Sequence, residues 1–178
     1  RLANPGTRRE VAQAIIRHEL AGGTGGADLV VAGITFDKTL QPEMLTPLTK
    51  GVIALVEGTV QGRGRIDWSA SGVTSRGSFT SRGLDLAAAF GPVKGLSGTI
   101  VFDDLLALRT EPNQTARIAE VNPGIPVNDG AIRYRLLEGF RMQVDGGEWP
   151  FVGGRLVLEP TLLLLSGKPL NEPVARYG

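Results

Sequence analysis

Apolar and polar side chains alternate with a period of two through residues 91–160, and this pattern predicts a series of β-strands. The apolar positions are Leu96, Ile100 and Phe102, then Ile132, Tyr134 and Leu136, then Phe140, Met142 and Val144, and finally Leu156 and Leu158. Residues typical of tight turns separate these runs, at 122–124, 128–130, 138–139 and 145–147. Short amphipathic strands joined by tight turns indicate an antiparallel meander.

The N-terminal part of the chain extends the same pattern. Residues 8–20 fit both a helical stripe and a strand face. A strand is favoured because the glycine cluster at 21–26 and a second alternating run at 28–37 would complete a hairpin. Residues 41–48 predict one short helix, since proline is tolerated at a helix start, and further strands are predicted at 52–61 and 64–70.

The middle of the chain requires one irregularity. Leu84, Leu86 and Ala88 share one parity, whereas Phe79 falls on the other, so a bulge at Gly83 is needed to bring Phe79 to the same face. Residues 161–165 predict a short apolar strand. The tail at 166–178 shows no period and predicts irregular structure.

These elements amount to about ten strands with no linker between them, which predicts an all-β segment over residues 1–165. Two architectures remain open from spacing alone. The apolar face could fill one half of a closed sandwich or barrel, or it could stay open as the trough of a long, curved sheet. Because the chain begins at Arg1 rather than Met, we expect it to be a piece of a larger protein.

Composition excludes several kinds of chemistry. The formal net charge is +1, from 19 basic and 18 acidic residues, so there is no electrostatic reason to expect a nucleic-acid partner. The chain has no Cys and one His, which excludes disulfides and a histidine-based metal site. No apolar run reaches the roughly 20 residues that a spanning helix needs, so any membrane anchor would lie outside this chain.

No motif in the sequence indicates catalysis or a cofactor. His18 has no partner that the sequence assigns. Asp103 and Asp104 are adjacent, so on a strand they would point to opposite faces, and a turn or cap before Leu105 is their expected role. The glycines at 22–26 lack the lysine of a phosphate loop, and Ser97 lacks the surroundings of a nucleophile elbow. The expected protein is therefore not an enzyme.

Several segments resemble the C-terminal part of YdbH-family proteins. They are 91–110 (GPVKGLSGTIVFDDLLALRT), 118–125 (IAEVNPGI), 129–137 (DGAIRYRLL) and 147–160 (GEWPFVGGRLVLEP), with weaker similarity at 45–49 and 62–68. The resemblance covers about residues 8–160 and is collinear. It places the chain with the AsmA-like group that includes TamB and YhdP.

The resemblance implies a large Gram-negative envelope protein, anchored in the inner membrane and reaching across the periplasm toward outer-membrane components. Its fold would be an elongated, strongly curved antiparallel sheet, an open β-taco-like groove implicated in moving phospholipid. The family has also carried the label of dicarboxylate transport. The remaining alternative is a structural or adhesive β-sandwich or β-solenoid with a closed core.

Physical chemistry favours lipid over dicarboxylate. Exposing an acyl tail of about 16 carbons to water costs on the order of 10 kcal/mol, so a carrier must offer continuous apolar cover. A dicarboxylate would need clustered Arg or Lys, but the basic residues at 133, 135, 141 and 155 are spread out on the opposite parity. We expect the following residues to line the groove and contact acyl chains: Ile100, Phe102, Ile132, Tyr134, Leu136, Phe140, Met142, Val144, Leu156 and Leu158.

Overall fold

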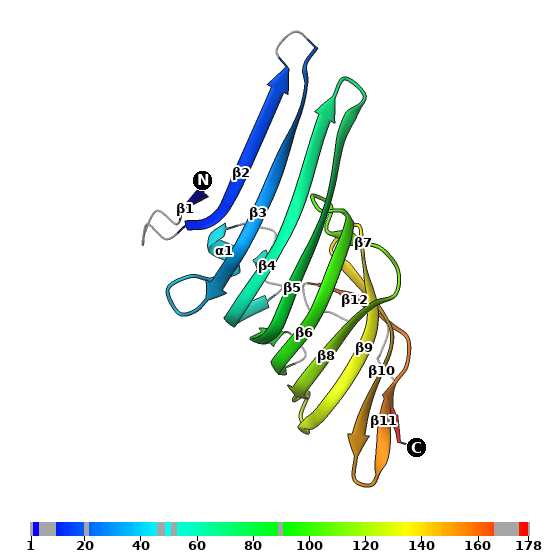
Figure 1. Ribbon diagram of the computed structural model, residues 1–178. Coiled ribbons are helices and arrows are strands. Elements are labelled where there is room, and N and C mark those ends of the chain that lie inside the picture. Colours follow the sequence, from blue (N-terminus) through cyan, green and yellow to red (C-terminus); the bar gives the residue numbers. More distant parts are fainter. Residues whose placement is uncertain are drawn as a thin grey trace.

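The computed structural model describes residues 2–3, 10–19, 22–45, 49–50, 53–88, 91–165 and 175–177 (Figure 1). They form one 13-stranded sheet and one helical turn. The elements are β1 (Leu2–Ala3), β2 (Glu10–Glu19), β3 (Thr24–Phe36), α1 (Pro42–Leu45), β4 (Ile53–Ser69), β5 (Gly72–Ala88), β6 (Gly91–Asp104), β7 (Arg109–Thr110), β8 (Gln114–Val121), β9 (Val127–Leu137), β10 (Arg141–Phe151), β11 (Gly154–Leu158), β12 (Thr161–Leu164) and β13 (Ala175–Tyr177). Among these residues, no helix is long and apolar enough to cross a membrane.

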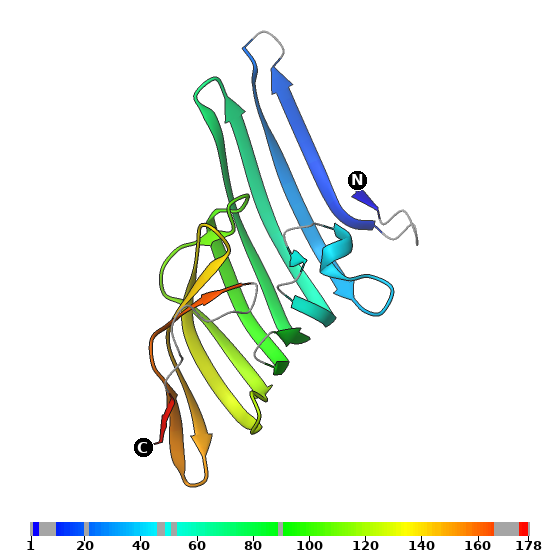
Figure 2. The same ribbon diagram turned by 180° about the vertical axis from the view of Figure 1, so that it is seen from behind.

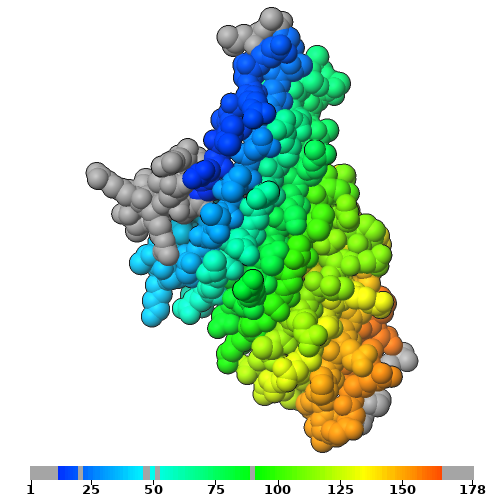
Figure 3. All heavy atoms as spheres, in the orientation of Figure 1, coloured from blue at the N-terminus to red at the C-terminus, as the bar shows by residue number. Residues whose placement is uncertain are grey.

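The strands follow chain order across the sheet, from β1 to β6, then β8 to β11, and finally β13 (Figure 3). Each pair is antiparallel, as tight hairpin connections require. β7 pairs only with β6, and β12 pairs with the first half of β10. The prediction of an all-β fold with an open antiparallel sheet is confirmed, and the described residues do not form two stacked sheets.

Some local predictions were wrong: the strands predicted at 52–61 and 64–70 form the single strand β4, and the turns predicted at 128–130 and 145–147 lie inside β9 and β10. Residues 10–19 of the ambiguous segment form strand β2, which pairs with β3, and Gly22 and Gly23 of the glycine cluster lie in the turn before β3. The expected helix near 41–48 is the single turn α1, while residues 46–48 lie outside the described residues. The division into a segment over 1–165 and an irregular tail over 166–178 stays a prediction. Residues 166–174 and 178 lie outside the described part, and residues 175–177 form β13 against β11.

Register shifts occur repeatedly along β3 to β6 and give the sheet its irregular twist. They lie at Val31/Ile34 on β3, at Ala54/Glu57 and Gly58/Val60 on β4, and at Ser81/Leu84 and Leu84/Leu86 on β5. A bulge adds a residue to one strand only, so it bends that strand and increases the local twist. The strands therefore curve instead of lying flat.

A glutamine side chain completes the hydrogen bonding at one of these bulges. Leu55 has a positive φ of 53°, and the next residue, Val56, is 1% exposed. The Gln41 side chain accepts a hydrogen bond from the Val56 N–H (2.9 Å) and donates to the Val56 carbonyl (2.9 Å) and to the Asp37 carbonyl (2.7 Å). An amide side chain thus replaces the backbone partner that the bulge removes.

Two groups of buried side chains hold the sheet together, one toward each end. The first contains Ala12, Val31, Ile34, Phe36, Leu40 and Val56. The second contains Val93, Ile118, Val121, Val127 and Trp149. Partly buried residues connect them across the middle, and Leu86 contacts both groups. The middle of the sheet is thus less filled than its two ends.

Candidate functional site

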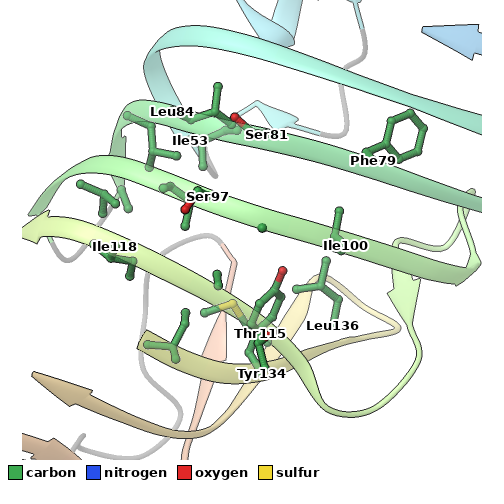
Figure 4. A pocket seen from close by; sticks show the side chains of 18 of the residues that line it. Ile53, Phe79, Ser81, Leu84, Ser97, Ile100, Thr115, Ile118, Tyr134 and Leu136 are labelled. Carbon is green, nitrogen blue, oxygen red and sulfur yellow. The ribbon is translucent and has the colours of Figure 1, made fainter. Parts of the chain in front are cut away.

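A hollow of about 490 Å³ lies on one face of the sheet, between the two buried groups (Figure 4). Side chains from β4, β5, β6, β8, β9 and β10 line it, together with Leu163, Leu164 and Leu165 of β12 and the turn that follows. Figure 2 shows β12 on the side of the sheet that is turned away in Figure 1. Strands from β4 to β12 therefore border one space. The volume lies within the roughly 300–1,000 Å³ typical of ligand sites.

The lining is apolar. It consists of Ile53, Val60, Phe79, Leu84, Leu86, Ala88, Val93, Leu96, Gly98, Ile100, Ala116, Ile118, Ile132, Leu136, Met142, Leu163, Leu164 and Leu165, with Thr80, Ser81, Ser97, Thr115 and Tyr134 as the polar members. No lining residue in the described part of the chain is charged. Nor do those residues contain a group of three acidic, His or Cys side chains that could hold a metal ion. The site therefore suits a hydrophobic ligand and offers no group for acid–base chemistry near neutral pH.

Cross-strand register explains how these side chains meet. Phe79 lies opposite Ile100, and Leu84 lies opposite Leu96, on β5 and β6. Residues directly opposite in an antiparallel pair share a face, so all four point into the hollow. The register of β5 shifts between Ser81 and Leu84 against both neighbouring strands, and this shift places Phe79 and Leu84 on one face. The predicted bulge at Gly83 is thereby confirmed.

Five of the ten residues predicted to line a groove lie together in the hollow: Ile100, Ile132, Tyr134, Leu136 and Met142. On β9 the alternation holds from Ile132 to Leu136, because the intervening Arg133 and Arg135 are exposed. Burial raises the pKa of the Tyr134 phenol to about 12, so this side chain is neutral at physiological pH.

The other five predicted residues lie elsewhere. Phe102 is 9% exposed and packs edge-on against Phe79, with ring centroids 6.1 Å apart and planes at 74°. Val144 is 2% exposed and lies on β10, opposite Tyr134 of β9 and Thr161 of β12. Leu156 and Leu158 pack against the buried group around Trp149. Phe140 lies in the turn between β9 and β10, where it is 44% exposed.

Several lining residues were not predicted to line a groove, although they belong to apolar or alternating segments that the sequence contains. Leu84 and Leu86 belong to an alternating run that the sequence analysis found. Leu163 and its neighbours belong to the apolar segment at 161–165. Ala116 and Ile118 alternate on β8 with exposed residues. No short-range signal, however, indicates that β12 and β5 border the same space.

Charged residues lie on the opposite face of the sheet. Arg65 on β4 forms ion pairs with Asp28 on β3 (2.9 Å) and with Asp67 (2.6 Å). The hydrogen bond to Asp67, and after it the bond to Asp28, raises the pKa of Arg65. The hydrogen bond from Arg65 in turn lowers the pKa of Asp67. Lys94 on β6 forms an ion pair with Glu120 on β8 (2.9 Å). The sheet therefore has one charged face and one apolar face.

The two acidic residues considered in the sequence have structural partners. Asp103 accepts a hydrogen bond from Arg109 (2.9 Å). Asp104 accepts hydrogen bonds from the Ser75 hydroxyl (2.7 Å) and the Ala107 N–H (3.1 Å), and these bonds lower its pKa. The predicted role of Asp104 in capping the turn after β6 is confirmed. His18, for its part, accepts a hydrogen bond from the Trp68 indole (3.2 Å).

Comparison with known proteins identifies one match. The family model described as "YdbH-like: Intermembrane phospholipid transport protein YdbH" matches residues 1–168. No curated protein and no solved structure matches the chain. The family match covers the whole hollow and almost the whole described sheet.

Proposed function

Since the chain belongs to the YdbH-like family of intermembrane phospholipid transport proteins, we propose that it is a segment of a bridge along which phospholipid acyl chains pass. The observation that carries this proposal is the uncharged hollow on the apolar face of an open sheet. In this proposal the segment works in the periplasm, as part of an inner-membrane-anchored protein. Inner- and outer-membrane components would then be the partners at the two ends of the bridge.

The energetics support a conduit for hydrocarbon. Each methylene group kept from water is worth about 0.8 kcal/mol, so an apolar wall offsets most of the cost of taking an acyl chain out of a membrane. A conduit must also release its cargo, so uniform contact suits it better than one strong polar anchor. The lining meets both conditions, because it is apolar from Ile53 on β4 to Met142 on β10 and carries no charge.

We assign contact with acyl chains to the five predicted residues in the hollow: Ile100, Ile132, Tyr134, Leu136 and Met142. Phe79, Leu84 and Leu96 join them as contact residues because they face the same space. For Phe102, Val144, Leu156 and Leu158 we propose a supporting role, since they pack against the side chains behind the hollow.

Neither alternative has a specific observation in its favour. Dicarboxylate binding would require basic side chains in the hollow, and none of the described lining residues is basic. A closed structural or adhesive domain would fill its core with its own side chains.

The test compares two substitutions on neighbouring residues of β6 in the intact protein. Ile100→Asp places a carboxylate in the hollow, whereas Thr99→Asp places it on the outer face, where Thr99 pairs with Thr80 through their hydroxyls (2.8 Å). Phospholipids that co-purify with each variant are quantified by mass spectrometry. We expect Ile100→Asp to reduce bound phospholipid by about tenfold or more, since a buried carboxylate is costly to desolvate.

Thr99→Asp should leave the bound phospholipid within about twofold of wild type. The proposal is wrong if the wild-type protein carries no phospholipid, or if the two variants lose it equally while both remain folded.

A further inference from the structure

One polar group in the hollow has no partner within the protein: the phenol hydroxyl of Tyr134. This residue lies on β9 between Ile132 and Leu136, and all three line the hollow. In the view of Figure 4 its side chain is drawn beside those of Ile100 and Leu136, which also line the hollow. No hydrogen bond to the Tyr134 hydroxyl is found among the described residues. The shift of its pKa to about 12 has burial as its only cause.

The neighbours of Tyr134 in the sheet do not bond to its hydroxyl. Its cross-strand partners are Gln114 on β8 and Val144 on β10. The Gln114 amide is already engaged, since it accepts a hydrogen bond from the Val101 N–H (2.8 Å) and donates to the Glu111 carbonyl (3.1 Å). Val144 has no polar side-chain atom. Neither described strand neighbour therefore accepts a hydrogen bond from this hydroxyl, whereas a ligand or a water molecule in the hollow could.

The other hydroxyls of the lining differ from Tyr134 in surroundings or in bonding. Ser81 donates to the Thr59 carbonyl (3.0 Å), and Thr80 pairs with Thr99. Ser97 lies opposite Arg117, and Thr115 lies opposite Arg133. Both arginines are exposed, whereas the cross-strand partners of Tyr134, Gln114 and Val144, are buried. Among the described lining residues with an unpaired hydroxyl, Tyr134 is therefore the one whose neighbours on both sides are buried.

We propose that the Tyr134 hydroxyl donates a hydrogen bond to the acyl ester carbonyl of a glycerophospholipid in the hollow. This inference rests on the proposed function. An ester carbonyl is the polar group nearest to the acyl chain, so it is the acceptor that reaches farthest into an apolar space. A single neutral hydrogen bond is of moderate strength. The bond would hold the glycerol region at β9 without preventing release, and it would favour ester-linked over ether-linked lipids.

The experiment compares two lipids that differ only in this carbonyl. The intact protein is incubated with equal amounts of dipalmitoyl phosphatidylethanolamine and its dihexadecyl ether analogue. It is then repurified, and the bound lipids are quantified by mass spectrometry. For one neutral hydrogen bond we expect the wild type to retain the ester over the ether by roughly 3- to 10-fold.

Tyr134→Phe removes the hydroxyl and keeps the ring. We expect its ester-to-ether ratio to fall to about one, with the amount of bound ether lipid unchanged. Thr99→Val is the matched control, because it removes a hydroxyl from the outer face, and its ratio should equal that of the wild type.

The outcomes separate this inference from the proposed function. Equal retention of both lipids by the wild type, an unchanged ratio in Tyr134→Phe, or an equal loss of both lipids in that variant would each overturn the role of Tyr134 and leave the hollow as a lipid site. Retention of neither lipid by the wild type would overturn the proposed function itself.

Discussion

Replacing Gln41 with Leu should open the bulge of β4 at Leu55 and Val56. Gln41 makes three hydrogen bonds, two of them to the backbone of Val56, which is 1% exposed. Leu has a similar volume but neither donor nor acceptor, so the substitution leaves the N–H and the carbonyl of Val56 without partners. An orphaned buried polar group costs about 1–3 kcal/mol, and because some water can enter the opened bulge, we expect a total loss of about 2–3 kcal/mol.

Hydrogen exchange in the intact protein measures this loss locally, without requiring the segment to fold alone. A loss of about 2–3 kcal/mol corresponds to roughly 30- to 150-fold faster exchange at the Val56 amide. Gln61→Leu is the control on the same strand, since Gln61 is exposed, and it should change exchange by less than about threefold. Exchange at Val56 in Gln41→Leu within threefold of wild type would refute the idea that the amide side chain holds the bulge.

Two further predictions concern stability. Asp104→Asn should destabilise the turn after β6 by about 1 kcal/mol at pH 7, because it removes the charge that accepts bonds from Ser75 and Ala107. The pKa of Asp104 is lowered in the folded state, so its contribution is complete above the unfolded pKa of about 3.9 and is lost as pH falls through the lower folded value. Melting curves of variant and wild type should therefore converge once the pH lies below that folded value. Gly130→Ala should lower the free energy of unfolding in urea by about 1–3 kcal/mol, since a methyl group there would overlap the Trp149 indole. Gly33→Ala is the control and should be nearly neutral, because its methyl group would meet only Thr59 at 3.7 Å; equal effects would contradict this packing argument.

Much of the fold follows from alternation. The pattern on β9 predicted which of residues 132–136 face the hollow and which face solvent, and the parity change between Phe79 and Leu84 predicted a bulge. Both predictions succeed because an antiparallel strand assigns its faces locally, residue by residue.

The extent of the hollow could not be predicted in the same way. Val144, Leu156 and Leu158 have the expected apolar character, yet they pack against other side chains instead of lining the open space. Their environment depends on β10, whose two halves pair with β12 and β11 on either side of a register shift. Phe140 matches the parity of its neighbours, but it has a positive φ of 54° in the turn, where alternation no longer applies.

Polar side chains that substitute for backbone partners also lack a sequence signature. The Gln41 side chain bonds to backbone groups of Asp37 and Val56, and the Gln114 side chain bonds to backbone groups of Val101 and Glu111. Nothing in the residues around them distinguishes these glutamines from exposed ones. Their roles become visible only when the strands are placed side by side.

The order of strands in the sheet has a consequence for how such a protein can change in size. Nearly every strand pairs with the strand before it and the strand after it in the chain, so a hairpin inserted at one turn would leave the other pairings intact. Each added hairpin would extend the sheet by about 10 Å, twice the spacing between strands. Duplication of a short stretch of coding sequence could therefore lengthen the sheet one hairpin at a time.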